Sequence, residues 1–198
     1  PTDGALRQRV GFRHSVRRLI GSKGIPSFWG VPIGGCPTLI SSPDSPQSLM
    51  AQTRIMSPEQ VRRTLRRFAY EIIERNRGME STVLFGIRES GVPLAHAVAE
   101  EMSVVSNGTV RARALNVTPF RDDRPGLDPP ATPPHNLDVA DRNVILIDDV
   151  IFTGRTARAA FDAVLQYGRP RSIQLVVLID RGHREYPIQP DCTGRRLQ

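Results

Sequence analysis

Apolar residues recur at helical spacing from residue 57 onward. The run Ser57-Pro58-Glu59-Gln60 is typical of a helix start, with an N-cap serine, a proline in the first turn and a capping-box glutamine. The apolar residues that follow share one face: Val61, Leu65, Phe68, Ala69, Ile72 and Ile73. The pattern predicts an amphipathic helix that ends near Gly78. The arginines off this stripe should face mostly solvent: Arg62, Arg63, Arg66 and Arg67.

Short apolar runs then alternate with helical patterns. Strands are predicted at 83–87, 110–117, 144–147 and 173–179, and helices at 92–102 and 156–167. Continuous apolar strands that alternate with helices indicate an α/β fold with a mostly parallel central sheet flanked by helices. Residues 119–134 contain six prolines, so a long loop is expected there, and such loops are usually functional or disordered.

The first 49 residues differ from the rest. They are rich in Ser, Pro, Gly and Arg and have no sustained period, which predicts a disordered or non-native extension (1–49) ahead of one domain (57–198). Two other interpretations remain open: a transit peptide, which is also Arg-rich and acid-poor, and translated upstream sequence before a start at Met50.

The charge and the cysteines narrow the class of protein. The net charge is +7, but residues 1–56 hold seven basic and two acidic residues, so the basic character of the predicted domain is weak evidence for nucleic-acid binding. Cys36 and Cys192 are far apart, which favours unpaired thiols in a reducing cytoplasm. No apolar run approaches the roughly 18–20 residues of a membrane span, so no membrane association is expected.

One stretch carries recognisable chemistry. A buried strand delivers Asp148 and Asp149 to its C-terminal end, and a turn with Thr153 and Gly154 opens a helix. Ligands bind at such strand ends in open α/β sheets, and the N–H groups of a new helix suit a phosphate. The carboxylates can accept hydrogen bonds from sugar hydroxyls, so the residue types predict a sugar-phosphate site. The whole stretch is Val144, Ile145, Leu146, Ile147, Asp148, Asp149, Val150, Ile151, Phe152, Thr153, Gly154, Arg155 and Thr156.

The aspartate pair has two other interpretations. A strand that ends in two aspartates also occurs in P-loop NTPases, but the only lysine, Lys23, does not supply G-x-x-x-x-G-K-[ST]. No G-x-G-x-x-G is present either. The remaining alternative is a structural one, in which the pair only caps a turn.

The stretch resembles the motif of type I phosphoribosyltransferases that binds 5-phosphoribosyl-1-pyrophosphate (PRPP). The wider chain resembles one branch, the bifunctional pyrimidine-operon regulators and uracil phosphoribosyltransferases (PyrR family). The resemblance covers essentially residues 57–196 and rests on the PRPP stretch and five further runs: 72–78, 86–91, 120–123, 168–173 and 180–185.

The resemblance implies a role for several residues. Asp148 and Asp149 would hold the ribose hydroxyls, and residues 153–156 would hold the 5′-phosphate. Arg121 would neutralise the departing pyrophosphate, so that Arg121, Asp148 and Asp149 would be the catalytic residues. An exposed turn salt bridge is the alternative for the run that contains Arg121. The base would be recognised by Asp180 and Arg181. The pyrophosphate loop would be Arg88, Glu89, Ser90 and Gly91, where Glu89 departs from the family pattern and should repel pyrophosphate.

The implied reaction converts uracil and PRPP to UMP and pyrophosphate. Mg²⁺ would be bound chiefly through PRPP, with no metal site of the protein's own and no protein nucleophile. Two alternatives stay open: a regulator without catalysis that senses nucleotides and binds RNA, and a transferase for a purine base or orotate.

The resemblance also implies regulation. The protein would bind a stem-loop in pyrimidine-operon leader mRNA, under control of uridine nucleotides (UMP and UTP), and form a homo-oligomer. The matching RNA-binding positions are Arg67, Arg75, His183 and Arg195, while Arg66, Tyr70 and Gln189 depart from the usual residues. A row of arginines on a helix is also typical of a solvated charged face. Relatives continue beyond residues 194–197 into a final strand segment, so an edge segment and part of the base pocket are expected to be missing here.

Overall fold

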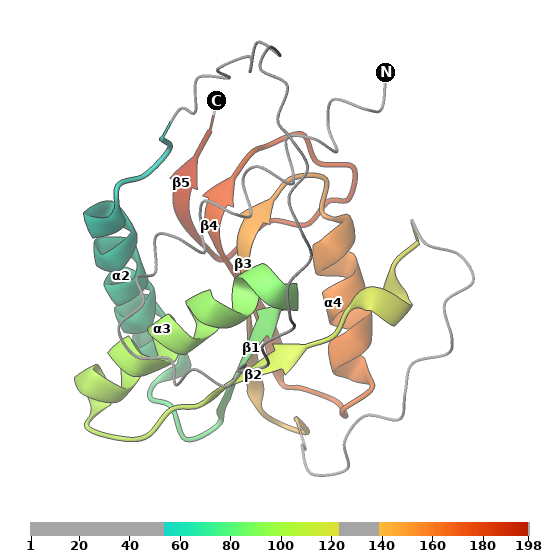
Figure 1. Ribbon diagram of the computed structural model, residues 1–198. Helices are drawn as coiled ribbons and strands as arrows, with labels where there is room; N and C mark the ends of the chain where they lie inside the picture. The colour runs from blue at the N-terminus through green and yellow to red at the C-terminus, as the bar shows by residue number, and fades with distance from the viewer. Residues whose placement is uncertain (1–53, 123–138, 198) are drawn as a thin grey trace, which may run out of the picture.

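The computed structural model describes residues 54–122 and 139–197, which form one parallel sheet with helices on both faces (Figure 1). In this part of the chain the strands are β1 (Thr82–Ile87), β2 (Ala112–Leu115), β3 (Asn143–Ile151), β4 (Ser172–Asp180) and β5 (Cys192–Arg196). Their order is β2-β1-β3-β4-β5, and every neighbouring pair is parallel. The α/β class predicted from the sequence is therefore confirmed.

Helix α2 (Pro58–Asn76) begins as its sequence predicts. The Ser57 hydroxyl accepts a hydrogen bond from the Gln60 N–H at 3.2 Å, and the Gln60 side chain accepts one from the Ser57 N–H at 2.7 Å. These two bonds satisfy donors that a helix start otherwise leaves unpaired. The helix ends at Arg77, whose φ of 55° is left-handed. Arg62, Arg63, Arg66 and Arg67 are exposed, as expected.

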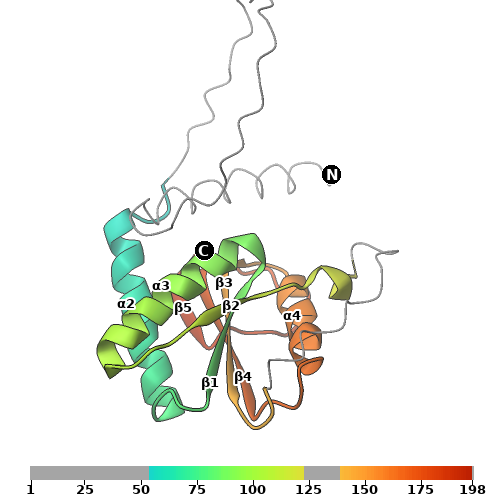
Figure 2. The ribbon, with the colours of Figure 1, turned by 60° about the horizontal axis from the view of Figure 1, so that its bottom comes forward.

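The sheet separates two apolar cores. On one face, α2 and α3 (Arg88–Ser106) pack on strand residues such as Leu84, Ile145 and Val176. On the other face, α4 (Arg155–Leu165) packs on their neighbours Phe85, Leu146 and Val177. Figure 2 shows the helices on either side of the sheet. Because successive strand residues face opposite sides, strands buried on both faces are apolar at nearly every position.

The strand order β2-β1-β3-β4-β5 reverses direction between β1 and β3. The chain leaves β1 through α3 on one face and leaves β3 through α4 on the other. Connections that diverge from adjacent parallel strands leave room between them, and ligands of open α/β sheets bind there. A ligand site is therefore expected at the ends of β1 and β3.

Several boundaries differ from the predicted ones. Strand β3 extends to Ile151 because Val150 and Ile151 stay paired with β4. Helix α3 begins at Arg88 instead of residue 92, with the turn made by Arg88 itself at a φ of 58°. Strand β2 is shorter than predicted and is followed by a 3₁₀ turn, η1 (Thr118–Phe120).

Strand β5 was not predicted. Its sequence, Cys-Thr-Gly-Arg-Arg, has no apolar run, and its pairing with β4 makes it a strand. It forms the sheet edge beyond β4, while a further edge segment after it remains an expectation. The predicted extension (1–49) and residues 123–134 of the predicted loop lie outside the described residues. No helix in residues 54–122 or 139–197 is long and apolar enough to cross a bilayer.

Candidate active site at the ends of strands β1 and β3

Two neighbouring carboxylates lie at the end of β3. Asp148 and Asp149 are 8% and 3% exposed, although aspartate is seldom buried without a partner. The Asp149 N–H donates a hydrogen bond to Asp148 Oδ1 at 2.9 Å. Asp149 Oδ2 is buried and has no hydrogen-bond partner among the residues that the structure describes. An unsatisfied buried acceptor costs stability, which is typical of a group that a ligand completes.

Burial raises the pKa of Asp148 well above its ordinary value, and repulsion from the Asp149 carboxylate adds to the effect. The positive charge of Arg88, at the start of α3, acts in the opposite direction. Adjacent carboxylates with a displaced pKa are typical of functional sites. A ligand that brings positive charge or hydrogen-bond donors would stabilise the ionised pair.

The start of α3 approaches this pair closely because of two glycines. A Cβ on Gly91 would collide with the backbone carbonyl of Ile147 and lie 3.4 Å from Asp148 Cα. A Cβ on Gly86 would collide with the backbone of Val92. The predicted pyrophosphate loop, Arg88 to Gly91, is the first turn of α3, and the positive end of a helix dipole favours anions. Glu89 lies in the same turn and is exposed.

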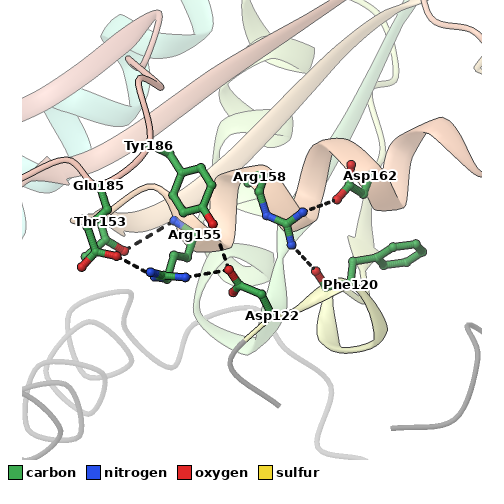
Figure 3. Close-up of polar contacts among 8 residues, drawn as sticks. All are labelled: Phe120, Asp122, Thr153, Arg155, Arg158, Asp162, Glu185 and Tyr186. Carbon is green, nitrogen blue, oxygen red and sulfur yellow. Dashed lines mark hydrogen bonds and ion pairs between the residues drawn. The ribbon is translucent and has the colours of Figure 1, made fainter. Parts of the chain in front are cut away.

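The start of α4 is the second predicted anion-binding element. Thr153 is buried, and Gly154 precedes the helix with a φ of 91°, a left-handed conformation that suits glycine. The N-terminus of α4 therefore opens beside the aspartate pair. The Arg155 side chain is engaged elsewhere: its guanidinium donates to Glu185 and Asp122 at 2.6 Å each (Figure 3).

The segment after β4, residues 181–186, is fastened to three successive carbonyls of the PRPP stretch. The Arg181 N–H donates to the Ile151 carbonyl at 3.0 Å, and the Arg184 guanidinium donates to the Phe152 carbonyl at 2.8 Å. The Thr153 carbonyl accepts from the N–H groups of residues 185 and 186 at 2.9 and 3.0 Å. The predicted base-recognition residues and the phosphate turn therefore form one connected unit.

Arg184 organises this unit. Its guanidinium donates to Asp180 Oδ1 at 2.7 Å and also to the Gly182 and Ile188 carbonyls. Burial alone would raise the pKa of Asp180, but hydrogen bonds from the Gly182 N–H and Arg184 outweigh it and lower the pKa. Asp180 is thus held ionised. Arg181 lies over the Phe152 ring, 4.5 Å from its centroid.

The structure brings the predicted ribose, phosphate, pyrophosphate and base residues to one end of the sheet. Sequence analysis missed Arg184, Asp122 and Tyr186, whose contacts join segments distant in the chain. A signal for Arg184 was available, since it lies within the run 180–185 that carries the resemblance. Arg121 follows η1 and is partly buried.

Three of the four predicted RNA-binding residues lie where α2 meets β5 and the residue before it. Arg67 donates to the Thr193 carbonyl at 2.9 Å, Arg75 pairs with Asp191 at 3.6 Å, and Arg195 donates to the Ile55 carbonyl. All three side chains remain exposed. The fourth residue, His183, lies in the segment after β4, with its ring 5.9 Å from that of Phe152.

Two solved phosphoribosyltransferase structures share this fold. A hypoxanthine-guanine phosphoribosyltransferase from Bacillus anthracis superposes with a TM-score of 0.54 at 17% identity, covering 74% of this chain and 82% of that one. The hypoxanthine phosphoribosyltransferase from Trypanosoma cruzi, in complex with the product IMP, gives 0.54 at 19% identity, covering 70% and 72%. At this identity the likeness shows the fold alone.

The sequence comparisons are more specific. The model of the phosphoribosyl transferase domain matches residues 52–196. Proteins named "Bifunctional protein PyrR" match over 145 residues, at 46% identity in Microcystis aeruginosa (72% of this chain, 82% of the relative) and 49% in Trichormus variabilis (72% and 81%). The PyrR of Deinococcus radiodurans is 46% identical over 149 residues (72% and 80%). The chain therefore belongs to the phosphoribosyl transferase domain family, within its PyrR branch.

Proposed function

We propose that this protein transfers the phosphoribosyl group of PRPP to uracil and regulates pyrimidine genes by binding leader mRNA. The observation that carries the transferase proposal is the buried Asp148–Asp149 pair between two helix starts. A ribose with a phosphate at one end and a pyrophosphate at the other needs hydroxyl acceptors flanked by two anion sites. The closeness of the α3 start to Asp148, and the start of α4 a few residues after Asp149, support this assignment.

In the proposed reaction, a uracil ring nitrogen forms a bond to ribose C1 while the bond from C1 to the pyrophosphate oxygen breaks. The uracil N–H proton is lost, and negative charge develops on the leaving group. The Asp148 and Asp149 carboxylates orient the ribose through its hydroxyls, and the α4 start holds the 5′-phosphate. Arg121 and the first turn of α3 stabilise the departing pyrophosphate. Catalysis then rests on positioning and electrostatics, without a protein nucleophile.

The residues fit a magnesium ion carried by PRPP. Within the described residues, no group of three His, Cys, Asp or Glu side chains could hold a metal. The unsatisfied Asp149 Oδ2 is an oxygen that could face a cation brought in by the substrate. Bound Mg²⁺ would neutralise charge on the pyrophosphate.

The test is pyrophosphate release from PRPP and Mg²⁺, with and without uracil. The Asp148→Asn/Asp149→Asn variant should lose uracil-dependent release by a factor of at least about 100, since it replaces both carboxylates with neutral amides. Asp141→Asn is the matched control, because it makes the same change in an exposed turn before β3. Equal release by wild type and the double variant would contradict the proposal. Pyrophosphate release that does not depend on uracil, or turnover with hypoxanthine or orotate, would indicate the alternative functions.

The RNA-binding proposal rests on the arginines at α2 and β5. Arg67, Arg75 and Arg195 are exposed and fixed by contacts to neighbouring elements, so they could meet a phosphate backbone with little further ordering. Uridine nucleotides would occupy the transferase site and bias RNA binding. An oligomer and a cytoplasmic location belong to the same proposal.

The RNA test measures binding of a pyrimidine-operon leader stem-loop over a range of salt concentrations. Each of Arg67→Ala, Arg75→Ala and Arg195→Ala should weaken binding and reduce the salt slope by about one. Arg171→Ala is the control, because this exposed arginine precedes β4 and lies outside the contacts described above between α2 and β5. If the three variants bind RNA with the same affinity and salt slope as the Arg171→Ala control, this surface does not contact RNA.

A further inference from the structure

The residues before and after Arg121 both accept hydrogen bonds from arginines of α4 (Figure 3). Before it, the Phe120 carbonyl accepts a hydrogen bond from Arg158 at 2.8 Å. After it, Asp122 Oδ2 accepts from Arg155 at 2.6 Å and from the Tyr186 hydroxyl at 2.9 Å. The Arg121 backbone is thus fixed at two points one residue away, in a chain segment that leads into the proline-rich region.

Tyr186 contacts both arginines that bind residues 120 and 122. Its ring lies 5.3 Å from the Arg155 guanidinium and 6.0 Å from that of Arg158, within the range of cation–π attraction. Glu185 also forms an ion pair with Arg155, with 2.6 Å between Arg155 Nε and Glu185 Oε2. Residues from three segments, 120–122, 155–158 and 185–186, therefore meet in one polar cluster.

The Asp122 and Arg155 side chains of this cluster are charged at neutral pH. The Tyr186 hydroxyl, with help from Arg155, lowers the pKa of Asp122. Glu185 is the main cause of a raised pKa for Arg155. The contacts among these groups are therefore those of a charged network at neutral pH.

This cluster adjoins the phosphate-binding turn. Arg155 is the first residue of α4 and follows Gly154 directly, while Glu185 and Tyr186 donate their N–H groups to the Thr153 carbonyl. Contacts that fix residues 120 and 122 therefore fix them relative to the 5′-phosphate turn. An arginine that must meet a departing pyrophosphate needs such a reference point, because a misplacement of about 1 Å can cost a large factor in rate.

We propose that Arg155, Arg158 and Tyr186 are positioning residues that hold Arg121 against the phosphate turn, where it meets the pyrophosphate of PRPP. This inference rests on the proposed function, since it assigns these three residues a role in that reaction through Arg121.

The test is a double-mutant cycle on the full-length protein. Tyr186→Phe keeps the ring and removes the hydroxyl bond to Asp122, and Arg155→Gln removes both ion pairs. Each substitution is made in wild type and in Arg121→Ala, and kcat, KM for PRPP and calorimetric PRPP affinity are measured. Arg66→Gln is the control, because it breaks an exposed ion pair with Glu101 between α2 and α3.

In wild type, Tyr186→Phe should lower kcat about threefold and Arg155→Gln about tenfold, with smaller changes in KM for PRPP. In the Arg121→Ala background both substitutions should have no further effect on kcat. The same loss in both backgrounds, or no loss in either, overturns the inference.

The two proposals can fail separately. If wild type binds PRPP but releases no pyrophosphate with uracil, the transferase function fails, and the same cycle on PRPP affinity decides the positioning role. Additive losses of affinity would then overturn it, and losses that vanish in Arg121→Ala would support it. If wild type does not bind PRPP, both proposals are overturned.

Discussion

The backbone N–H of Asp149 donates to the side chain of Asp148, its neighbour in the same strand. This bond partly compensates the burial of one carboxylate, while Oδ2 of the other has no hydrogen-bond partner in residues 54–122 and 139–197. Burial still makes the ionised form of Asp148 less stable in the fold than in water. The site stores this unfavourable energy until a ligand supplies donors or positive charge.

Asp148→Asn should stabilise the unliganded protein at neutral pH. Because the pKa of Asp148 is raised in the fold, its contribution to stability is fully present below the unfolded value, near 4, and is lost as pH rises through the folded pKa. Thermal unfolding at about pH 8 should show a higher Tm for Asp148→Asn than for wild type. The gap should narrow as the pH is lowered toward about 5. A lower Tm for the variant at pH 8 would contradict the assigned cause. Asp141→Asn should show no such gap.

Arg184→Ala should destabilise the domain by about 3–5 kcal/mol, because it leaves the buried Asp180 carboxylate without its cation. The pKa of Asp180 is lowered in the fold, so the stability from this pair is present above pH 4 and is lost as pH falls through the folded value. Urea unfolding measures the loss. Arg184→Lys should recover only part of it, since one ammonium cannot reach all the carbonyls that the guanidinium bonds.

The exposed pair of Arg66 and Glu101 supplies the comparison for Arg184. Arg66→Ala should cost less than about 1 kcal/mol, as exposed ion pairs usually do. Equal losses for the two variants would show that the Arg184 contacts are ordinary surface contacts.

Gly91→Ala should destabilise the protein by about 1–3 kcal/mol and weaken PRPP binding. The added methyl group would collide with the Ile147 carbonyl, so α3 or β3 must shift. Gly108→Ala is the control, because its Cβ would lie at an ordinary 3.5 Å from the Met79 methyl group. Denaturant unfolding and calorimetric PRPP titration should separate the two variants, and equal behaviour would refute the close approach.

The Cys192 thiol should resist alkylation in the folded protein. It is buried, and burial with a neighbouring Glu71 raises its pKa to about 12, while thiolates are the reactive form. In a Cys36→Ser background, labelling at about pH 8 should be slow and should rise to the rate of a free thiol in denaturant. Rapid labelling of the native protein would mean that the β5 edge opens readily.

Sequence reasoning succeeded where local patterns decide structure. The Ser57–Gln60 capping box and the apolar stripe of α2 follow from spacing alone. The continuous apolar character of 144–147 and 175–179 correctly predicted strands buried on both faces. The aspartate pair and the helix start beyond it also follow from the order of residues in one short run.

It failed where distant segments decide structure. Strand β5 exists because β4 offers a free edge, and no feature of Cys192–Arg196 itself indicates a strand. The link of Asp122 to Arg155 and Tyr186 joins residues 33 and 64 positions apart. Periodicity cannot reveal such partners, since they depend on how the ends of the sheet assemble.

The contact between Arg195 and the Ile55 carbonyl brings the first and last described elements together, and α2 lies beside β5 in Figure 1. During synthesis, α2 leaves the ribosome long before its partner strand exists. Its apolar face can pack on the earlier strands, but its contacts with β5 must wait until β5 has left the ribosome. A nascent chain stalled before residue 192 should therefore be more sensitive to protease around α2 than a chain that includes β5.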